Sequence, residues 1–136
     1  MNYSPPIRTF GLIVALLFPL IAGCGKSNRP SLGTVHGRVT LDGKPLAHAN
    51  VVFRPASGVR ESGSVTDENG EYQLKYIGDV MGGAIGTNTV QVTKQLTPDP
   101  NSQIVPARYN KNSTLVKEVI AGDNSIDLEL TSARTP

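Results

Sequence analysis

Short segments in which apolar and polar residues alternate run through residues 34–132, and Gly, Asp and Asn residues separate them. Alternation with a period of two is typical of strands that bury one face, whereas an amphipathic helix repeats its apolar residues every three or four positions. The helical spacing is missing from this part of the chain. The pattern predicts seven strands, over residues 34–41, 49–53, 64–66, 72–76, 87–93, 115–120 and 125–130.

The residues between these strands are those that tight turns require. Asp42 and Gly43 follow the first strand, and both residue types tolerate positive φ. They predict a hairpin in which 49–53 returns beside 34–41. The turn residues at 67–70 predict a second hairpin, between the third and fourth strands.

Alternation also assigns most of the predicted strands an inward face. Asp127 and Glu129 of the last strand point outward. The inward residues are Val35, Val39, Leu41, Phe53, Tyr72, Leu74, Tyr76, Val90, Val92, Ile126, Leu128 and Leu130. Because one apolar face per strand fills a single small core, the predicted fold is all-β, a seven-stranded antiparallel sandwich of two sheets.

A different apolar pattern precedes the strands. Arg8 is followed by a continuous apolar run over 10–22, and then by polar residues. A transmembrane helix needs about 20 apolar residues, so this run is too short to span a bilayer. A positive start, a short apolar run and small residues at its end are typical of an export signal, which predicts a signal peptide over 1–23.

The apolar run ends in Ile21, Ala22, Gly23 and Cys24, an aliphatic residue and two small residues before the chain's single cysteine. This tetrapeptide resembles the lipobox of bacterial lipoproteins. The resemblance implies cleavage before Cys24 and acylation of that residue as the new N-terminus. Two alternatives stay open: a small residue in an ordinary secretory signal, and a free thiol in a retained anchor.

An acylated Cys24 would attach the domain to a membrane. Bacterial lipoproteins carry two or three acyl chains, and more than one chain is needed for stable attachment. Gly25 stands where an aspartate would favour retention in the inner membrane of some bacteria, so the outer membrane is preferred. The expected organisation is a lipidated tether over 24–33, one domain over 34–132 and a tail over 133–136.

The charge of the chain argues against one class of partner. It has 13 basic and 11 acidic residues, and the two signs are interspersed along the chain. Nucleic-acid binders show a basic stripe or a clearly basic domain. We therefore expect no nucleic acid as partner, and the single cysteine excludes an intramolecular disulfide.

Several segments carry residues shared with a known domain family. They are VHGRVTLDGKPL at 35–46, ANVVF at 49–53, TDENGEY at 66–72 and PARYN at 106–110, followed by Leu115, Glu118, Val119 and Asn124. These segments resemble the carboxypeptidase regulatory-like, transthyretin-like domain, and more narrowly the small planctomycete lipoproteins built on it. The resemblance implies a transthyretin-like sandwich. It implies no activity, because the shared residues are turn and core positions.

Two groups of residues invite a metal-binding interpretation. His36 and His48 are the only histidines, and a hairpin could bring them together, but a zinc site needs three or four ligands. The acidic residues in 67–71 surround a glycine as calcium ligands do, yet Asp and Asn also bond to their own backbone in turns. We interpret the histidines as exposed strand residues and the acidic segment as a turn, and expect neither metal nor cofactor.

The remaining candidates concern catalysis and ligand binding. Ser62 and Ser64 lie outside any nucleophile motif, so no catalytic residue is assigned. Tyr109, in the long loop over 95–110, is the aromatic residue placed to bind a ligand. The sequence thus predicts a non-enzymatic, membrane-anchored β-sandwich that serves as an interaction, adhesion or scaffold module at the cell envelope. The alternative is an extracellular carbohydrate- or peptide-binding module that uses Tyr109.

Overall fold

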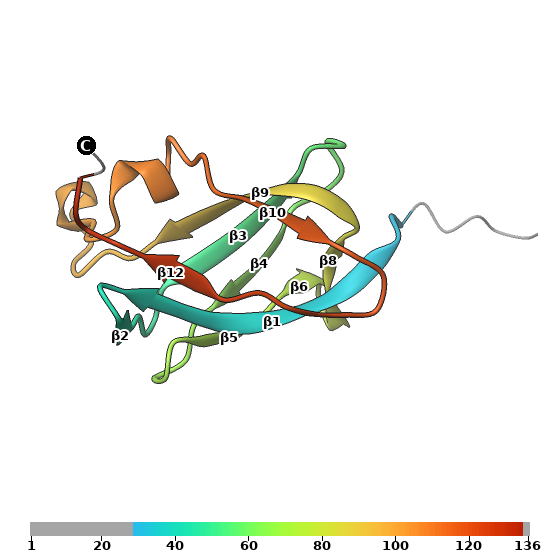
Figure 1. The fold of residues 1–136 in the computed structure, drawn as a ribbon, viewed down its shortest axis with the longest axis horizontal. Helices are drawn as coiled ribbons and strands as arrows, with labels where there is room; N and C mark the ends of the chain where they lie inside the picture. The colour runs from blue at the N-terminus through green and yellow to red at the C-terminus, as the bar shows by residue number, and fades with distance from the viewer. Residues whose placement is uncertain (1–28, 135–136) are drawn as a thin grey trace, which may run out of the picture.

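The computed structural model describes residues 29–134, which form a sandwich of two β-sheets (Figure 1). This confirms the predicted all-β class. The chain enters the sandwich at one end of its long axis, and the C-terminal residues lie at the opposite end (Figure 1). None of the helices in the described part of the chain has the length and hydropathy needed to cross a membrane.

Twelve short strands and two single-turn 3-10 helices make up the described chain. The strands are β1 (Leu32–Leu41), β2 (Lys44–Pro45), β3 (Asn50–Pro55), β4 (Ser62–Val65), β5 (Glu71–Gln73), β6 (Lys75–Ile77), β7 (Val80–Met81), β8 (Gly83–Ala84), β9 (Gly86–Thr93), β10 (Val116–Val119), β11 (Asp123–Ser125) and β12 (Leu128–Leu130). The helices are η1 (Pro100–Ser102) and η2 (Ala107–Tyr109).

The first sheet is organised around β1. β2, β5 and β8 pair antiparallel with successive parts of β1, whereas β11 and β12 pair parallel to it. His36 pairs with both Gln73 and Ser125, so β5 and β11 lie on opposite edges of β1. The second sheet is antiparallel throughout, in the order β10-β9-β3-β4-β6-β7.

The core lies between the two sheets and is built mainly from the predicted inward residues. Its buried members are Val35, Val39, Leu46, Ala49, Val51, Phe53, Tyr72, Leu74, Val90, Val92, Val105, Val119, Leu128 and Leu130. Leu41 and Ile126 are partly buried and pack against this cluster. Asp127 and Glu129 are exposed, as the alternation predicted.

The prediction that 49–53 pairs with 34–41 is wrong. Asp42 and Gly43 do form a tight turn, with φ angles of 52° and 79°, but the strand that returns beside β1 is the short β2. The chain then turns at His48, whose φ is 55°, and β3 joins the other sheet between β4 and β9. This crossing lets the apolar faces of β1 and β3 cover each other, which a hairpin within one layer cannot do.

The predicted strand over 72–76 is two strands in different sheets. β5 pairs with β1, whereas β6 pairs with β4 through Gly63 and Lys75. The chain changes sheets at Leu74, which is fully buried between them. Tyr76 follows this change and is only half-buried, so its predicted place in the core is wrong.

The predicted strand over 125–130 is also divided, into β11 and β12. Between them, the amide of Ile126 donates to the carbonyl of His36 at 2.8 Å, and the amide of Arg38 donates to the carboxylate of Asp127 at 2.8 Å. Because β11 and β12 run parallel to β1, the first sheet is mixed. The expectation of a wholly antiparallel, seven-stranded sandwich is corrected accordingly.

Candidate functional site: a polar groove along β5

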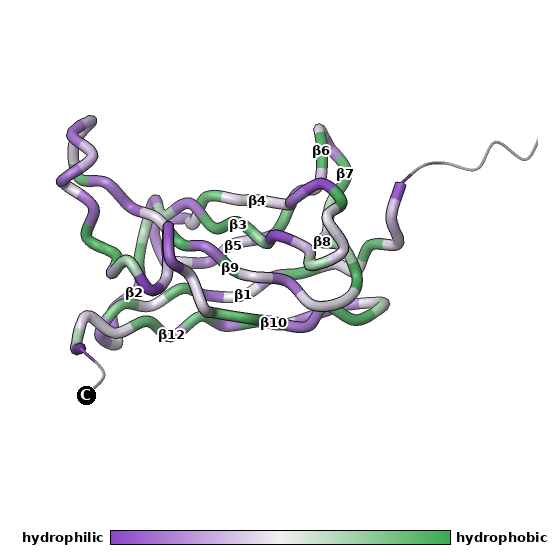
Figure 2. Tube along the Cα trace, turned by 90° about the horizontal axis from the view of Figure 1, so that it is seen from above, coloured by the Kyte–Doolittle hydropathy of each residue, from purple (hydrophilic) through white to green (hydrophobic). Residues whose placement is uncertain are grey.

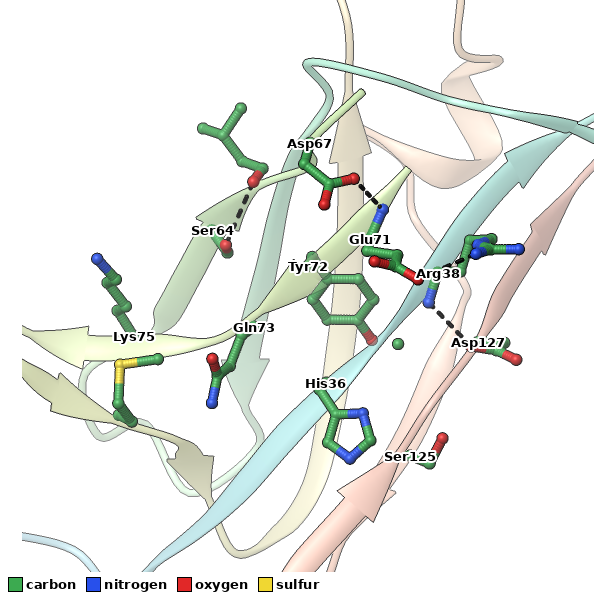
Figure 3. Close-up of a pocket in the computed structure, with 13 residues that line it drawn as sticks. His36, Arg38, Ser64, Asp67, Glu71, Tyr72, Gln73, Lys75, Ser125 and Asp127 are labelled. Atoms are coloured by element: carbon green, nitrogen blue, oxygen red, sulfur yellow. Dashed lines mark hydrogen bonds and ion pairs between the residues drawn. The ribbon is translucent and has the colours of Figure 1, made fainter. Parts of the chain in front are cut away.

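A groove opens where β4 and β5 diverge into different sheets. The second sheet keeps β4, while β5 turns to β1, so the two consecutive strands do not pair. The groove has a volume of about 740 Å³ and is open to solvent along the flank of the sandwich. It is lined by His36, Gly37, Arg38, Ser64, Val65, Asp67, Glu71, Tyr72, Gln73, Lys75, Met81, Ser125 and Asp127 (Figure 3).

Strand alternation explains why this lining is polar. Within 71–75 the even positions, Tyr72 and Leu74, are buried, and the odd positions point outward. Tyr72 is 4% exposed, and its hydroxyl donates to the carbonyl of Ile126 at 2.6 Å. Burial raises the pKa of Tyr72, with a smaller contribution from the charge of Asp127, so this phenol stays protonated at neutral pH. Tyr72 therefore forms a fixed floor of the groove.

Opposite charges at one end of the groove are already paired with each other. The guanidinium of Arg38 lies 3.0 Å from the carboxylate of Glu71, on the neighbouring strand. Asp127 accepts from the backbone of Arg38, and Asp67 accepts from the amides of Asn69 and Glu71 at 2.9 Å each. These carboxylates serve the fold, and the groove as a whole carries both signs of charge.

His36 stands at the side of the groove beside β11. Its Nε2 lies 3.0 Å from the carboxylate of Asp123, which also accepts from the hydroxyl of Thr34 at 3.0 Å. The hydrogen bond from His36 and then that from Thr34 hold the pKa of Asp123 below its ordinary value. Both side chains of the His36–Asp123 pair are largely exposed, so the pair contributes little to stability.

Three polar side chains of the groove have no partner among the described residues. Gln73, Lys75 and Ser125 are exposed and make no side-chain hydrogen bond or ion pair with residues 29–134. They come from β5, β6 and β11, so the backbone at each position is held in a strand. Figure 3 shows Ser64 and Lys75 toward one end of the groove, and Arg38 and Asp127 toward the other. The groove can offer these three side chains to a polar ligand without breaking an existing bond.

The structure does not bring the two histidines together. His48 lies in the turn after β2, and its Nε2 is 2.8 Å from the carboxylate of Glu68. His36 has Asp123 as its separate partner. Within residues 29–134, no three side chains of His, Cys, Asp or Glu gather as metal ligands would.

The acidic segment over 67–71 is a turn. The carboxylate of Asp67 accepts from two backbone amides of this segment, and Gly70 has a φ of 74°. Gly70 also donates to the carbonyl of Asp67 at 3.0 Å. The carboxylate of Asp67 is thus bonded to the turn's own backbone, whereas Glu68 and Glu71 pair with His48 and Arg38.

The two serines take structural positions. Ser62 is 1% exposed, and its hydroxyl has no hydrogen-bond partner among the described residues. Ser64 lines the groove, and its hydroxyl donates only a long bond of 3.5 Å, to the carbonyl of Val65. Neither serine hydroxyl is hydrogen-bonded to a histidine in the described chain.

Tyr109 lies in η2 and packs against the core while remaining half-buried. The guanidinium of Arg108 covers its ring at 4.8 Å from the centroid, and its hydroxyl accepts from the amide of Thr131 at 3.4 Å. A second cavity, of about 560 Å³, lies under the long loop, but Tyr109 is not part of its lining. The role of Tyr109 in ligand binding stays a prediction.

Ile21, Ala22, Gly23 and Cys24 lie outside the described residues, as does the whole predicted signal peptide over 1–23. Their assignment rests on the sequence alone. The groove residues Arg38, Gln73 and Lys75 were missed as a site. The signal that could have found Gln73 and Lys75 is their alternation with buried Tyr72 and Leu74, but the divergence of β4 from β5 is a tertiary feature that no local pattern encodes.

Comparisons with known proteins do not assign the chain to a family. No family model matches it, and no curated protein sequence matches it. One similar solved structure is that of a DUF3823 family protein from Parabacteroides merdae, with 12% sequence identity and a TM-score of 0.44 over 74% of this chain and 46% of that one. Another is a 9R-lipoxygenase from Cyanothece PCC8801, with 17% identity and a TM-score of 0.41 over 77% of this chain and 17% of that one. The chain thus spans less than half the length of either protein, and neither likeness bears on function.

Proposed function

We propose that this protein is a non-enzymatic lipoprotein, tethered to the cell envelope by acylated Cys24, whose β-sandwich presents the groove along β5 to a polar partner. The sandwich is assigned to the transthyretin-like type of the carboxypeptidase regulatory-like domain, on the sequence resemblance. The outer membrane is the preferred location because Gly25 follows the cysteine.

The observation that carries the binding role is the presence of uncommitted polar groups in a preformed groove. Gln73 supplies an amide, Lys75 an ammonium group and Ser125 a hydroxyl, and no described residue occupies them. Binding sites combine a concave surface with a few fixed polar groups that orient the ligand. Because these residues lie in paired strands, little backbone ordering is needed on binding.

The non-enzymatic part of the proposal is supported by how the reactive side chains are used. His36 and His48 each lie against an exposed carboxylate, and neither is hydrogen-bonded to a hydroxyl of the described residues. A nucleophile needs a base within hydrogen-bond reach to be activated. Hydrolysis of a peptide or ester substrate by the purified protein would contradict this part.

A carbohydrate ligand is the second candidate, and the same groove favours it. Amide, hydroxyl and ammonium groups beside the charged pair of Arg38 and Glu71 match the many hydroxyls of a glycan. Sugar rings also stack on aromatic faces, and Tyr72 is buried. Tyr109 therefore remains the alternative aromatic contact, in the loop at the far end of the sandwich.

The anchor is tested by Cys24→Ser. We expect this variant to lose labelling by radioactive fatty acid and to leave the membrane fraction, or to accumulate with its signal peptide uncleaved. Unchanged labelling and membrane extraction of the variant would falsify the lipid anchor.

The groove is tested by the double variant Gln73→Ala, Lys75→Ala. Its matched control is Gln95→Ala, Lys44→Ala, which removes an exposed amide and an exposed ammonium group elsewhere on the surface. Binding to envelope proteins and to a glycan array is measured for both. We expect the groove variant to lose at least ten-fold in affinity and the control to bind normally. Loss of binding in Tyr109→Ala, with the groove variant unaffected, would place the site in the long loop instead.

A further inference from the structure

Four large apolar side chains are exposed at the end where the described chain enters the sandwich. Val59 is 37% exposed, Ile77 45%, Ile85 39% and Ile120 61%. We call this surface the tether end. Single exposed aliphatic residues are normal on proteins, but a group gathered at one end calls for a partner.

Two of these residues flank the entering chain. Val119 of β10 pairs with Gly86 of β9, and Ile120 and Ile85 lie just beyond this last pair. The carbonyl of Ile120 approaches Gly33 of β1 so closely that a Cβ there would lie 2.2 Å from its oxygen. The amide of Ile85 donates to the carbonyl of Ser31 at 3.0 Å. The most exposed aliphatic residue of the tether end therefore lies beside the point where the chain arrives from Cys24.

The other two residues continue the same end across the second sheet, toward its opposite edge. Ile77 pairs with Val80 in the hairpin of β6 and β7. Val59 lies in the loop between β3 and β4, and this loop is tied to the start of β9, because the amide of Ala56 donates to the carbonyl of Thr87 at 2.9 Å. Figure 1 places this loop and the entry of β1 at one end of the long axis, and Figure 2 shows hydrophobic colour at the β6–β7 hairpin and the neighbouring turns.

The distance to the lipid is short. Six residues separate Cys24 from Ser31, and even a fully extended chain of this length reaches only about 25 Å. A lipidated Cys24 would therefore keep the tether end next to the headgroups. Tethering raises the effective concentration of a surface to the millimolar range, so contacts too weak to bind from solution become significant.

We propose that the tether end docks on the lipid surface, with its four aliphatic side chains at the boundary between headgroups and acyl chains. This inference rests on the proposed lipid anchor. The exposed charges here are of both signs, with Arg60 beside Val59 and Asp79 in the β6–β7 turn. The contact is thus apolar, and it forms on zwitterionic as well as anionic membranes.

The test uses the full-length lipoprotein in vesicles of phosphatidylcholine brominated on its acyl chains. A bimane label is placed at Ile120→Cys or Ile77→Cys, since acylation blocks Cys24. The matched control is Leu96→Cys, at a residue 66% exposed in the long loop at the opposite end. All three sites are exposed, so the variants are expected to fold. We expect bromine quenching of the labels at 120 and 77, and at most a few per cent at 96.

The outcomes separate the docking from the anchor. Absence of quenching at 120 and 77 in protein that floats with the vesicles overturns the docking and leaves the anchor intact. Equal quenching at all three sites also overturns it, because the domain then has no preferred end toward the lipid. Failure of the protein to float overturns the anchor itself and the docking with it.

Discussion

Asp42 shows how a single turn residue holds distant parts of the chain together. Its positive φ suits the turn after β1, and its carboxylate accepts from the hydroxyl of Ser132 at 2.6 Å and from the amide of Ser132 at 2.9 Å. The hydroxyl of Thr131 adds a third bond at 3.3 Å. The guanidinium of Arg108 donates to the carbonyls of Thr131 and Ala133 in the same C-terminal segment. One turn thus fixes the end of the domain opposite the tether.

This arrangement predicts a pH-dependent effect of Asp42→Asn. The hydroxyl of Ser132, followed by its amide, holds the pKa of Asp42 below its ordinary value of 3.8. A carboxyl with a lowered folded-state pKa stabilises the fold above its unfolded pKa, and this contribution is lost as pH falls through the folded value. Asparagine keeps the positive φ but carries no charge. We expect the variant to have a lower urea midpoint than the parent at pH 7, and the difference to close below pH 3.8.

Asp79→Asn is the matched control, because the carboxylate of Asp79 is exposed and bonds to no described residue. Its midpoint should follow that of the parent at every pH. If the urea midpoint of Asp42→Asn differs from that of the parent by the same amount from pH 7 to pH 3, the loss of stability comes from the geometry of the amide and not from the missing charge.

At the scale of the elements, the close approach of β1 to the link between β11 and β12 determines the first sheet. A Cβ atom at Gly37 would lie 1.9 Å from the carbonyl oxygen of Ile126 and 2.6 Å from its carbon. Tyr72 bonds to the same carbonyl from the other side of β1. Only glycine leaves room for this backbone, so Gly37 fixes how β1, β5 and the C-terminal strands meet.

Gly37→Ala is therefore expected to destabilise the domain by about 1–3 kcal/mol, since backbone atoms have to move to admit the methyl group. For a domain of this size, each kcal/mol lowers Tm by roughly 4–8 °C. Gly63→Ala is the control, because its Cβ would come no closer than 3.3 Å to Val51. Thermal unfolding followed by circular dichroism measures both. A Tm for Gly37→Ala at or above that of the control contradicts the close approach.

The elements also show which parts of the fold follow from local pattern. The strand positions and the inward residues Val35, Val90 and Leu128 could be predicted. Successive side chains of a strand point to opposite faces, so a strand that buries one face has apolar residues at every second position. The Asp42–Gly43 turn could be predicted because few residue pairs adopt its backbone angles.

The pairing of the strands could not be predicted, for a physical reason. Alternation shows that a strand buries one face, but it does not show to which sheet the strand belongs. The changes of sheet at Leu74 and His48 therefore could not be inferred from the local pattern. The groove depends on another change of sheet, between β4 and β5, and was missed with it. Tyr109 was placed in the correct loop, but its cover by Arg108 depends on how that loop folds back on the core.

At the scale of the whole molecule, the two proposed surfaces have different orientations. The tether end faces along the long axis, whereas the groove opens on the flank between β4 and β5 (Figures 1 and 3). The groove starts at Lys75 and Met81, on the same β6–β7 hairpin as Ile77, so in a domain seated on its tether end this end of the groove is the one nearest the lipid. The loop over 95–110 and the C-terminal residues then lie farthest from the membrane.

Tether length should affect these two surfaces differently. An insertion of 20 Gly and Ser residues between Asn28 and Arg29 lowers the effective concentration of the tether end at the membrane by roughly ten-fold, because this concentration falls about as the −3/2 power of linker length. We expect weaker bromine quenching of a label at residue 120, unchanged flotation with vesicles, and unchanged affinity of the groove for its partner. The same insertion combined with Ile120→Asp should abolish the quenching of a label at residue 77. If the longer tether instead weakens groove binding, the membrane itself forms part of that site, and the groove is not an independent surface of the domain.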